Sequence, residues 1–294
     1  MPLSATIAPA VPAAPATAPA APATAPPDAA PATAPPDAAP ATGPQPRRRA
    51  RRSAARCAAL LADGAAELLW PTRCVGCGQP GELLCPECRA SLPWVEQRWA
   101  CPSCGAPFGH LTCTECDGSW PMRSMVAAMG FHGTPARMAA CLKDSHELRL
   151  AGPIACAMQC ALEEAAAWPA RDGLPRHDPA ALDAVCFVPA TASAYARRGY
   201  DHMELVARAL ASRLGLPLAD VLVRAEARDQ RELGREERAR NLEGTARACA
   251  DVSGARLLLV DDVATTGASL AEATRALLAR GAADVEACAL ARVW

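Results

Sequence analysis

The most informative segment of the chain runs Leu257-Leu258-Leu259-Val260-Asp261-Asp262-Val263-Ala264-Thr265-Thr266-Gly267-Ala268-Ser269. Four consecutive aliphatic residues are typical of a strand that is buried on both faces of a parallel sheet. Two carboxylates follow, and open α/β sheets bind their ligands beyond the carboxyl ends of the strands. The small and hydroxyl-bearing residues after them open a predicted helix over 269–280, whose first backbone amides can bind an anion.

Carboxylates beside an anion-binding turn predict a ligand that carries both hydroxyl groups and a phosphate. Asp261 and Asp262 would hold sugar hydroxyls, directly or through Mg²⁺, and the turn behind them would hold the phosphate. The residues predicted to bind it are Ala264, Thr265, Thr266, Gly267 and Ser269. A Walker-A loop and a dinucleotide-binding fingerprint are excluded, because neither glycine pattern occurs in the chain. The segment therefore predicts a ribose phosphate site.

Helix-like and strand-like segments alternate after Trp120. Helices are predicted at 135–143, 147–167, 201–214 and 269–280, and strands at 183–189, 256–260 and 285–292. This alternation predicts an α/β domain with a parallel sheet, which we place at 121–294.

Eight of the fifteen cysteines form C-x-x-C pairs in a short segment before that domain. They are Cys74, Cys77, Cys85, Cys88, Cys101, Cys104, Cys113 and Cys116. Each pair forms a tight turn that directs two thiolates at one tetrahedral ion, and two pairs complete a Cys₄ site. We therefore expect two structural Zn²⁺ ions in a double zinc ribbon at 74–120. His110 lies between the last two pairs, but the ligand set is complete without it, and we expect a surface histidine.

The charge of the ribbon segment argues against contact with DNA. Residues 74–120 carry two arginines and five acidic residues, a net charge of −3. Eight thiolates with two zinc ions lower this sum to about −7, whereas phosphate binding needs positive charge. The whole chain has 30 basic and 31 acidic side chains and so has no general attraction to nucleic acid. A structural or docking role is the favoured prediction for the ribbons.

The N-terminal part differs in composition from the rest. Of residues 1–46, 32 are proline or alanine, which predicts a disordered, dispensable tail at 1–52 that ends in an arginine run. A short amphipathic helix is predicted at 53–73. No signal-peptide pattern opens the sequence, and no apolar run approaches the ~20 residues of a membrane span. With its many free cysteines, the chain is expected in the reducing cytoplasm.

At 257–269 the sequence resembles the PRPP-binding motif of type I phosphoribosyltransferases. Together with the cysteine pairs it resembles the ComF family, which joins a double zinc ribbon to a phosphoribosyltransferase domain, and the resemblance spans roughly residues 70–294. Shorter matching pieces are Phe131-His132-Gly133, Leu142-Lys143, Val188-Pro189, Arg197-Arg198-Gly199-Tyr200, Gln230, Glu237-Arg238 and Asn241-Leu242-Glu243-Gly244.

The resemblance implies displacement of pyrophosphate from Mg²⁺-bound PRPP by an unknown acceptor, in a protein linked to DNA uptake. The alternative is a non-catalytic adaptor of the uptake machinery, with PRPP as a regulatory ligand and partner proteins docked on it. In either case Pro189, Ala190 and Thr191 would face pyrophosphate, and the arginine-rich segment 224–240 would close over the site. Asp261 and Asp262 would be joined in catalysis by cationic groups, for which the candidates are Arg197, Arg198, Arg228 and Arg238.

Two features concern the pyrophosphate side of this site. Lys143 is the only lysine among 30 basic residues, so we expect it either to contact a phosphoryl group or to be an ordinary surface residue. Many relatives have Val-Pro-Leu-His after the strand and Arg-Gly-Phe-Asn-Gln further on. Here these segments read Pro189-Ala190-Thr191-Ala192 and Arg198-Gly199-Tyr200-Asp201-His202, without that histidine and without the Asn-Gln pair.

Overall fold

The computed structural model describes residues 71–225 and 244–294, all within one compact unit that spans Leu60–Trp294. The predicted tail, most of the predicted helix at 53–73, and Arg228 and Arg238 lie outside the described residues. The main elements are α2 (Pro86–Ala90), β1 (Ser124–Gly130), α3 (Thr134–Asp144), a 3₁₀ turn (Leu148–Leu150), α4 (Ala151–Ala165), β2 (Ala184–Phe187), α5 (Ala192–Arg198), α6 (His202–Leu214), β3 (Leu222–Arg224), β4 (Ala246–Ala248), β5 (Arg256–Ala264), α8 (Ala268–Ala279) and β6 (Asp284–Arg292).

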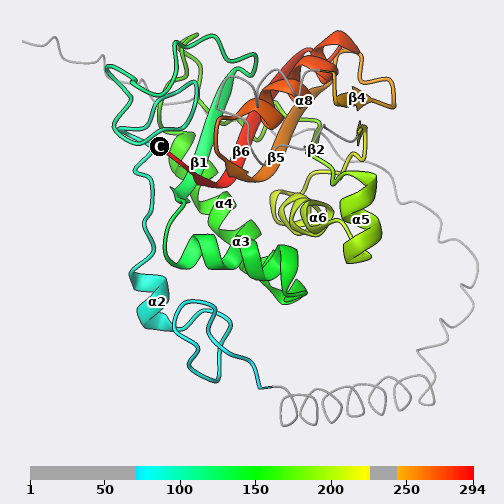
Figure 1. Ribbon diagram of the computed structural model, residues 1–294. Coiled ribbons are helices and arrows are strands. Elements are labelled where there is room, and N and C mark those ends of the chain that lie inside the picture. Colours follow the sequence, from blue (N-terminus) through cyan, green and yellow to red (C-terminus); the bar gives the residue numbers. More distant parts are fainter. Residues whose placement is uncertain (1–70, 226–243) are drawn as a thin grey trace, which may run out of the picture. The chain divides into compact units, whose positions relative to one another are not determined.

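The described strands form a parallel sheet in the order β1-β6-β5-β2, and β3 and β4 form a separate antiparallel pair (Figure 1). The predicted parallel α/β fold is confirmed, and β2, β5 and β6 fall in predicted strand segments. Strand β5 extends beyond the predicted end at Val260, because Asp261 and Ala264 remain paired with Ala289 and Arg292 of β6. Both aspartates therefore lie within the strand rather than after it.

Strand β1 was not predicted from the sequence. Its residues Ser-Met-Val-Ala-Ala-Met-Gly contain a single β-branched side chain, so local strand propensity is weak. All seven residues are buried, and β1 pairs with β6 from Ser124 to Gly130. Tertiary pairing and packing, rather than local preference, make this segment a strand.

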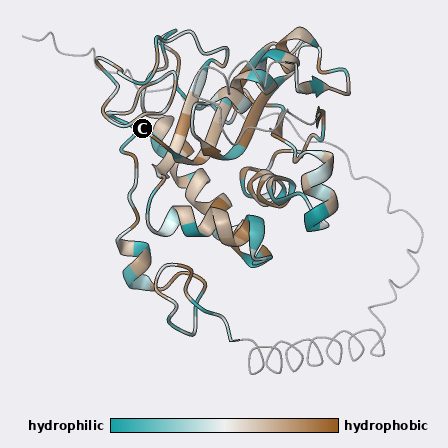
Figure 2. Cartoon of the chain, in the orientation of Figure 1, coloured by the Kyte–Doolittle hydropathy of each residue, from teal (hydrophilic) through white to brown (hydrophobic). Residues whose placement is uncertain are grey.

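Helices cover both faces of the sheet. α3, α4 and α6 pack on one face, where Leu258 belongs to the core, and α8 packs on the other, where Leu259 belongs to the core (Figure 1). The strands are coloured mainly towards the hydrophobic end of the scale, as expected for a sheet buried between two layers (Figure 2). The predicted helix at 147–167 begins as the 3₁₀ turn and continues as α4.

Two cysteine-rich segments precede β1. The first contains α2, and the second packs directly on the sheet, since a Cβ added at Gly105 would lie 3.2 Å from the Ala127 backbone nitrogen in β1. Cys101 and Cys104 are buried at this contact. The predicted domain limits at 74–120 and 121–294 remain predictions.

Candidate active site

Strand β5 carries the two aspartates to the carboxyl edge of the sheet. Side chains alternate along a strand, so Asp261 shares the α8 side with Leu259, and Asp262 shares the other side with Leu258. Asp262 accordingly contacts side chains of α3 and α6, while Asp261 lines a cavity of about 110 Å³ at the start of α8. Adjacent carboxylates therefore face different partners.

A tight turn joins β5 to α8. Gly267 lies directly before the helix with a φ of 75°, in the left-handed region that favours glycine. A Cβ at this position would lie 1.9 Å from Cη2 of Trp120, so the turn also needs glycine because an indole ring packs against it. The hydroxyl group of Thr266 accepts a hydrogen bond from the Ala268 amide at 3.4 Å.

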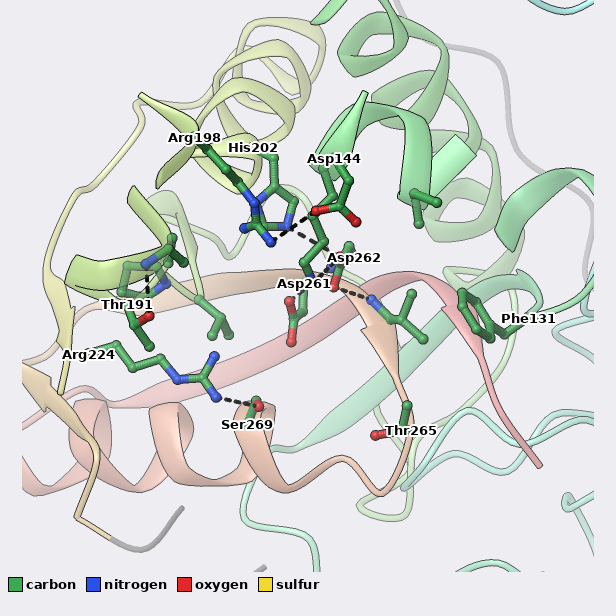
Figure 3. A pocket seen from close by; sticks show the side chains of 18 of the residues that line it. Phe131, Asp144, Thr191, Arg198, His202, Arg224, Asp261, Asp262, Thr265 and Ser269 are labelled. Carbon is green, nitrogen blue, oxygen red and sulfur yellow. Dashed lines mark hydrogen bonds and ion pairs between the residues drawn. The ribbon is translucent and has the colours of Figure 1, made fainter. Parts of the chain in front are cut away.

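A cavity of about 650 Å³ opens beside the two aspartates (Figure 3). The sheet edge contributes Asp261 and Asp262, the turn after β5 contributes Thr265, and helices α3 and α5 contribute Lys143 and Arg198. Its walls combine acidic, basic and hydroxyl-bearing side chains, a composition suited to a small ligand with both hydroxyl and phosphoryl groups.

Two side chains and one backbone amide donate to the Asp262 carboxylate, whose Oδ1 accepts from the Val263 amide at 2.7 Å. Its Oδ2 lies 3.3 Å from Nζ of Lys143 and 3.2 Å from Nε2 of His202. Burial by itself raises the pKa of Asp262, but the hydrogen bond with His202 and the charge of Lys143 outweigh this effect and hold it below its ordinary value. Asp262 is thus a carboxylate in the folded protein.

The pKa of the neighbouring carboxyl group, that of Asp261, is shifted in the opposite direction. Burial and the negative charge of Asp262 raise the pKa of Asp261 to about 8, and the positive charges of Arg224 and Lys143 only partly offset the increase. Arg224 extends from β3 towards the start of α8, where its guanidinium donates to the Ser269 hydroxyl at 3.2 Å (Figure 3). The pKa of Asp261 is therefore raised and that of Asp262 lowered, although the two carboxyl groups stand side by side.

The loop after β2 forms another wall of the cavity. Thr191 caps α5, its Oγ1 accepting from the Ala194 amide at 3.3 Å. Asp201 holds the same loop from the start of α6: its Oδ2 accepts from the Ala190 amide at 2.6 Å, and its Oδ1 accepts from the Met203 amide at 2.9 Å. The position of the loop thus depends on the Asp201 carboxylate.

Most residues predicted for the site line one of the two cavities. The larger cavity is lined by Lys143, Pro189, Ala190, Thr191, Arg198, Asp261, Asp262, Thr265 and Ser269, and the smaller one adds Ala264, Thr266 and Gly267. Arg198 is also 3.4 Å from the Asp144 carboxylate. Arg197 is exposed and lines neither cavity, so the structure does not bring it to the other predicted residues.

The sequence interpretation missed three contributors. Asp201 and His202 entered it only as departures from the family pattern, and Arg224 only as the first residue of the arginine-rich segment. The available signal for Asp201 was its place before a helical pattern, since aspartate is a preferred N-cap residue. No local signal connects His202 to Asp262, because the contact spans 60 positions.

Each predicted set of four cysteines is brought together. Within Cys74–Cys88 and within Cys101–Cys116, one Sγ atom from each of the four ligands lies within 4.8 Å of the other three. Tetrahedral Zn²⁺ with bonds of about 2.3 Å separates its sulfur ligands by about 3.8 Å. The Sγ atoms of Cys101 and Cys116 are 3.8 Å apart, and those of Cys104 and Cys113 are 3.6 Å apart. The donor sets therefore fit two structural zinc ions. His110 is exposed, as expected.

Comparison with known proteins agrees with this two-part organisation. A double zinc ribbon domain matches residues 65–118, and a phosphoribosyl transferase domain matches residues 204–293. The DNA utilization protein YhgH of Salmonella typhi is 31% identical over 233 residues, which cover 76% of this chain and 97% of that protein.

The chain belongs to the ComF family. Further ComF relatives include the DNA utilization protein YhgH of Salmonella typhimurium strain LT2, 30% identical over 76% of this chain and 97% of the relative, and that of Escherichia coli strain K12, 28% identical over 65% and 83%. Among solved structures, a phosphoribosylpyrophosphate synthetase from Mycobacterium smegmatis is 25% identical, with a TM-score of 0.23 over 37% of this ComF chain and 27% of the synthetase. No helix among the described residues is long and apolar enough to cross a membrane.

Proposed function

We propose that this ComF protein binds PRPP with Mg²⁺ and transfers its phosphoribosyl group to an acceptor, with release of pyrophosphate. The observation that carries the proposal is the cavity at the carboxyl edge of the sheet. There the carboxylates of Asp261 and Asp262 and a hydroxyl-rich turn meet three cationic side chains, those of Lys143, Arg198 and Arg224. A sugar that carries one monophosphate and one pyrophosphate needs this combination of donors and acceptors.

In this proposal each wall takes one part of the ligand. Asp261 and Asp262 accept hydrogen bonds from the ribose hydroxyls, and the turn at 264–269 donates its amides to the 5′-phosphate. Pyrophosphate lies near Ala190 and Thr191, with Lys143 and Arg198 in reach of its charge. Mg²⁺, which prefers oxygen ligands, would be held by a carboxylate of this pair and by ligand oxygens, and would neutralise the leaving group.

The transfer breaks the bond between ribose C1 and the pyrophosphate oxygen and forms a bond from C1 to the acceptor, which loses a proton. Positive charge develops on the ribose ring, and negative charge on the departing pyrophosphate. The ionised Asp262 stabilises the first, and the side chains of Lys143 and Arg198 stabilise the second. Such a reaction depends on positioning and charge rather than on a nucleophilic side chain.

We also propose that the protein works in DNA uptake or utilization in the cytoplasm. The names of its relatives support the first part, and ribbons that hold zinc through free thiolates suit a reducing compartment. The net charge of −3 on the ribbon segment supports docking to a partner protein rather than direct DNA contact.

Calorimetry with PRPP and Mg²⁺ tests the binding site. We expect heat of binding with the wild type and with Asp220→Ala, an exposed carboxylate outside both cavities. Asp262→Ala should weaken binding at least about tenfold, or about 1.4 kcal/mol. Equal affinity of all three proteins, or no binding to the wild type, would disprove the proposed site.

A second measurement separates the enzyme from the alternative, an adaptor that uses PRPP only as a regulatory ligand. The protein is incubated with PRPP, Mg²⁺ and candidate acceptor bases, and released pyrophosphate is measured. Release that depends on an acceptor and is lost in Asp262→Ala supports the transferase. PRPP binding without release for any acceptor favours the adaptor.

A further inference from the structure

Arg292, the last residue of β6, connects the second ribbon to the turn after β5. Its side chain is completely buried. Nε donates to the backbone carbonyl of Cys104 at 3.1 Å, and Nη1 donates to the carbonyl of Ala264 at 2.9 Å and to that of Thr265. One guanidinium thus bonds simultaneously to a zinc-ligand turn and to the predicted phosphate-binding turn.

An indole ring adds a second connection between the same two segments. The Arg292 guanidinium carbon lies 5.6 Å from the ring centroid of Trp120, which follows the second cysteine set in the sequence. Trp120 also packs against Cys101 and Cys104 and leaves no room for a side chain at Gly267. The turn after β5 therefore rests on the second ribbon through both a guanidinium and an aromatic ring.

The hydrogen bonds of Arg292 also determine which way the amides of the turn point. In a planar trans peptide the N–H is directed opposite to the preceding carbonyl. Because the carbonyls of Ala264 and Thr265 point inward to Arg292, the N–H groups of Thr265 and Thr266 point away from it. Within residues 71–225 and 244–294, neither N–H donates a backbone hydrogen bond. Two consecutive free amides are the donors that an anion site requires.

Arg292 brings a positive charge into the protein interior. Among the described residues no acidic side chain forms an ion pair with Arg292, and its buried Nη2 has no hydrogen-bond partner. Burying an unbalanced charge is costly. The second cysteine set, whose Cys104 carbonyl accepts from Arg292, has a net charge of about −2 when four thiolates hold one Zn²⁺. The four thiolates that hold Zn²⁺ in this ribbon therefore leave it with a net negative charge, which favours the buried guanidinium.

We propose that Arg292 is a positioning residue that makes the ligand affinity of the turn at 264–267 depend on the second zinc ribbon. With the second Cys₄ site filled, Arg292 holds two carbonyls inward and leaves two amides available for a phosphate. Without zinc in the second Cys₄ site, the turn at Cys104 is no longer ordered and the guanidinium loses its hydrogen bond to it. The N–H groups of Thr265 and Thr266 are then no longer held in one direction. The identity of the ligand as PRPP rests on the proposed function, but the dependence of the turn on the ribbon does not.

The test compares Arg292→Lys with Arg176→Lys. Both arginines are completely buried, but Arg176 donates to the carbonyls of Gln97 and Pro169 and does not contact the turn. A lysine keeps the charge, yet its single ammonium cannot span the carbonyls on both sides of Arg292. Arg292→Lys should accelerate hydrogen exchange of the Ala268 and Ala271 amides, which donate to the Thr266 hydroxyl and the Gly267 carbonyl of the turn, and should weaken PRPP binding about tenfold. Arg176→Lys should change neither.

Two cysteine variants test the dependence on zinc. Cys116→Ser, in the second set, should remove one zinc ion and reproduce the faster exchange at Ala268 and Ala271. Cys77→Ser, in the first set, should remove one zinc ion and leave that exchange unchanged. If a variant fails to fold, exchange is measured on the wild type while a chelator removes its zinc, and the turn should lose protection with one of the two ions.

Linkage provides a readout that simple destabilisation would not reproduce. If zinc in the second ribbon favours PRPP, PRPP must favour that zinc by the same factor. PRPP should therefore slow the release of one zinc ion from the wild type, and not from Arg292→Lys.

Unchanged exchange in Arg292→Lys, or equal effects of Arg292→Lys and Arg176→Lys, would overturn the proposal. If the wild type binds no PRPP, the proposed function fails instead, and the exchange measurements still decide whether the ribbon controls the turn.

Discussion

Nε2 of His202 lies 3.2 Å from Oδ2 of Asp262, the oxygen that also accepts from Lys143. The imidazole comes from the start of α6 and the ammonium from the end of α3, so two helices on the same face of the sheet meet at one carboxylate oxygen. The direction of the carboxylate is therefore set before any ligand arrives. A preorganised acceptor of this kind costs little reorganisation when a sugar binds.

Replacing His202 tests whether this contact matters for the ligand. His202→Leu removes a donor that lowers the pKa of Asp262, so that pKa should rise and PRPP binding should weaken about tenfold. His202→Gln keeps an N–H donor and should stay within about threefold of the wild type. A carbon-detected NMR titration of Asp262 and calorimetry measure the two effects. Wild-type behaviour of the leucine variant would show that the carboxylate is held without His202.

Asp261 predicts a pH dependence of stability. Its pKa rises from an ordinary value of 3.8 to about 8 on folding, so between these values the folded protein binds a proton that the unfolded chain lacks. The free energy of unfolding contributed by this group therefore falls as pH increases from about 4 towards 8. Asp261→Asn cannot ionise and should show a smaller decrease. Urea unfolding of both proteins at pH 5 and pH 8 measures it, and identical pH dependence would refute the shift.

Asp201 offers a way to disturb the loop after β2 without removing a helix cap. In Asp201→Asn the side-chain oxygen can still cap α6, but an amide group replaces the oxygen that accepts from Ala190. We expect weaker PRPP binding with helix stability largely retained. Asp201→Ala should lose both contacts and about 1 kcal/mol more of stability. Equal thermal stability of the two variants would contradict the separation of the two roles.

The contact between Gly267 and Trp120 predicts that replacing two similar glycines with alanine reduces stability by different amounts. Gly267 and Gly215 have φ angles of 75° and 70°, but only at Gly267 would a Cβ meet a neighbour, at 1.9 Å from the indole. Gly215→Ala should cost about 1 kcal/mol through backbone strain alone. Gly267→Ala should cost at least about 2 kcal/mol, because the indole must also move. Chemical denaturation measures the loss of unfolding free energy in both variants. Equal losses would mean that the Trp120 ring moves aside without an energetic penalty.

The sequence predicted the parts of the site that obey local rules. A buried strand, a turn and a helix can each be predicted from a few neighbouring residues: the aliphatic run, the small residues after the two aspartates, and the segment that follows. The structure confirms this order as β5, the turn and α8. The cysteine sets were equally predictable, because C-x-x-C spacing fixes the geometry of each pair. The exact end of β5 was not, since its last residues are kept in the sheet by β6.

Features that depend on distant partners could not be predicted in this way. β1 has weak strand preference and becomes a strand only beside β6. In the sequence, His202 resembles any polar residue at the start of a helix. Its contact with Asp262 arises only because α6 packs over β5 in the folded protein. Arg292 ends a predicted strand, but nothing near it in the sequence indicates bonds to both Cys104 and Ala264.

The strand order has a consequence for how the protein folds during its synthesis on the ribosome. β6 lies between β1 and β5 and follows both in the sequence, and among the described strands it is the one with which β1 pairs. While translation proceeds, the edge of β1 that β6 covers in the folded protein lacks its partner strand until residues 284–292 emerge. Closing so long a loop is entropically slow. A nascent chain arrested before β6 would therefore present an open sheet edge, and aggregation rather than partial activity is its expected fate.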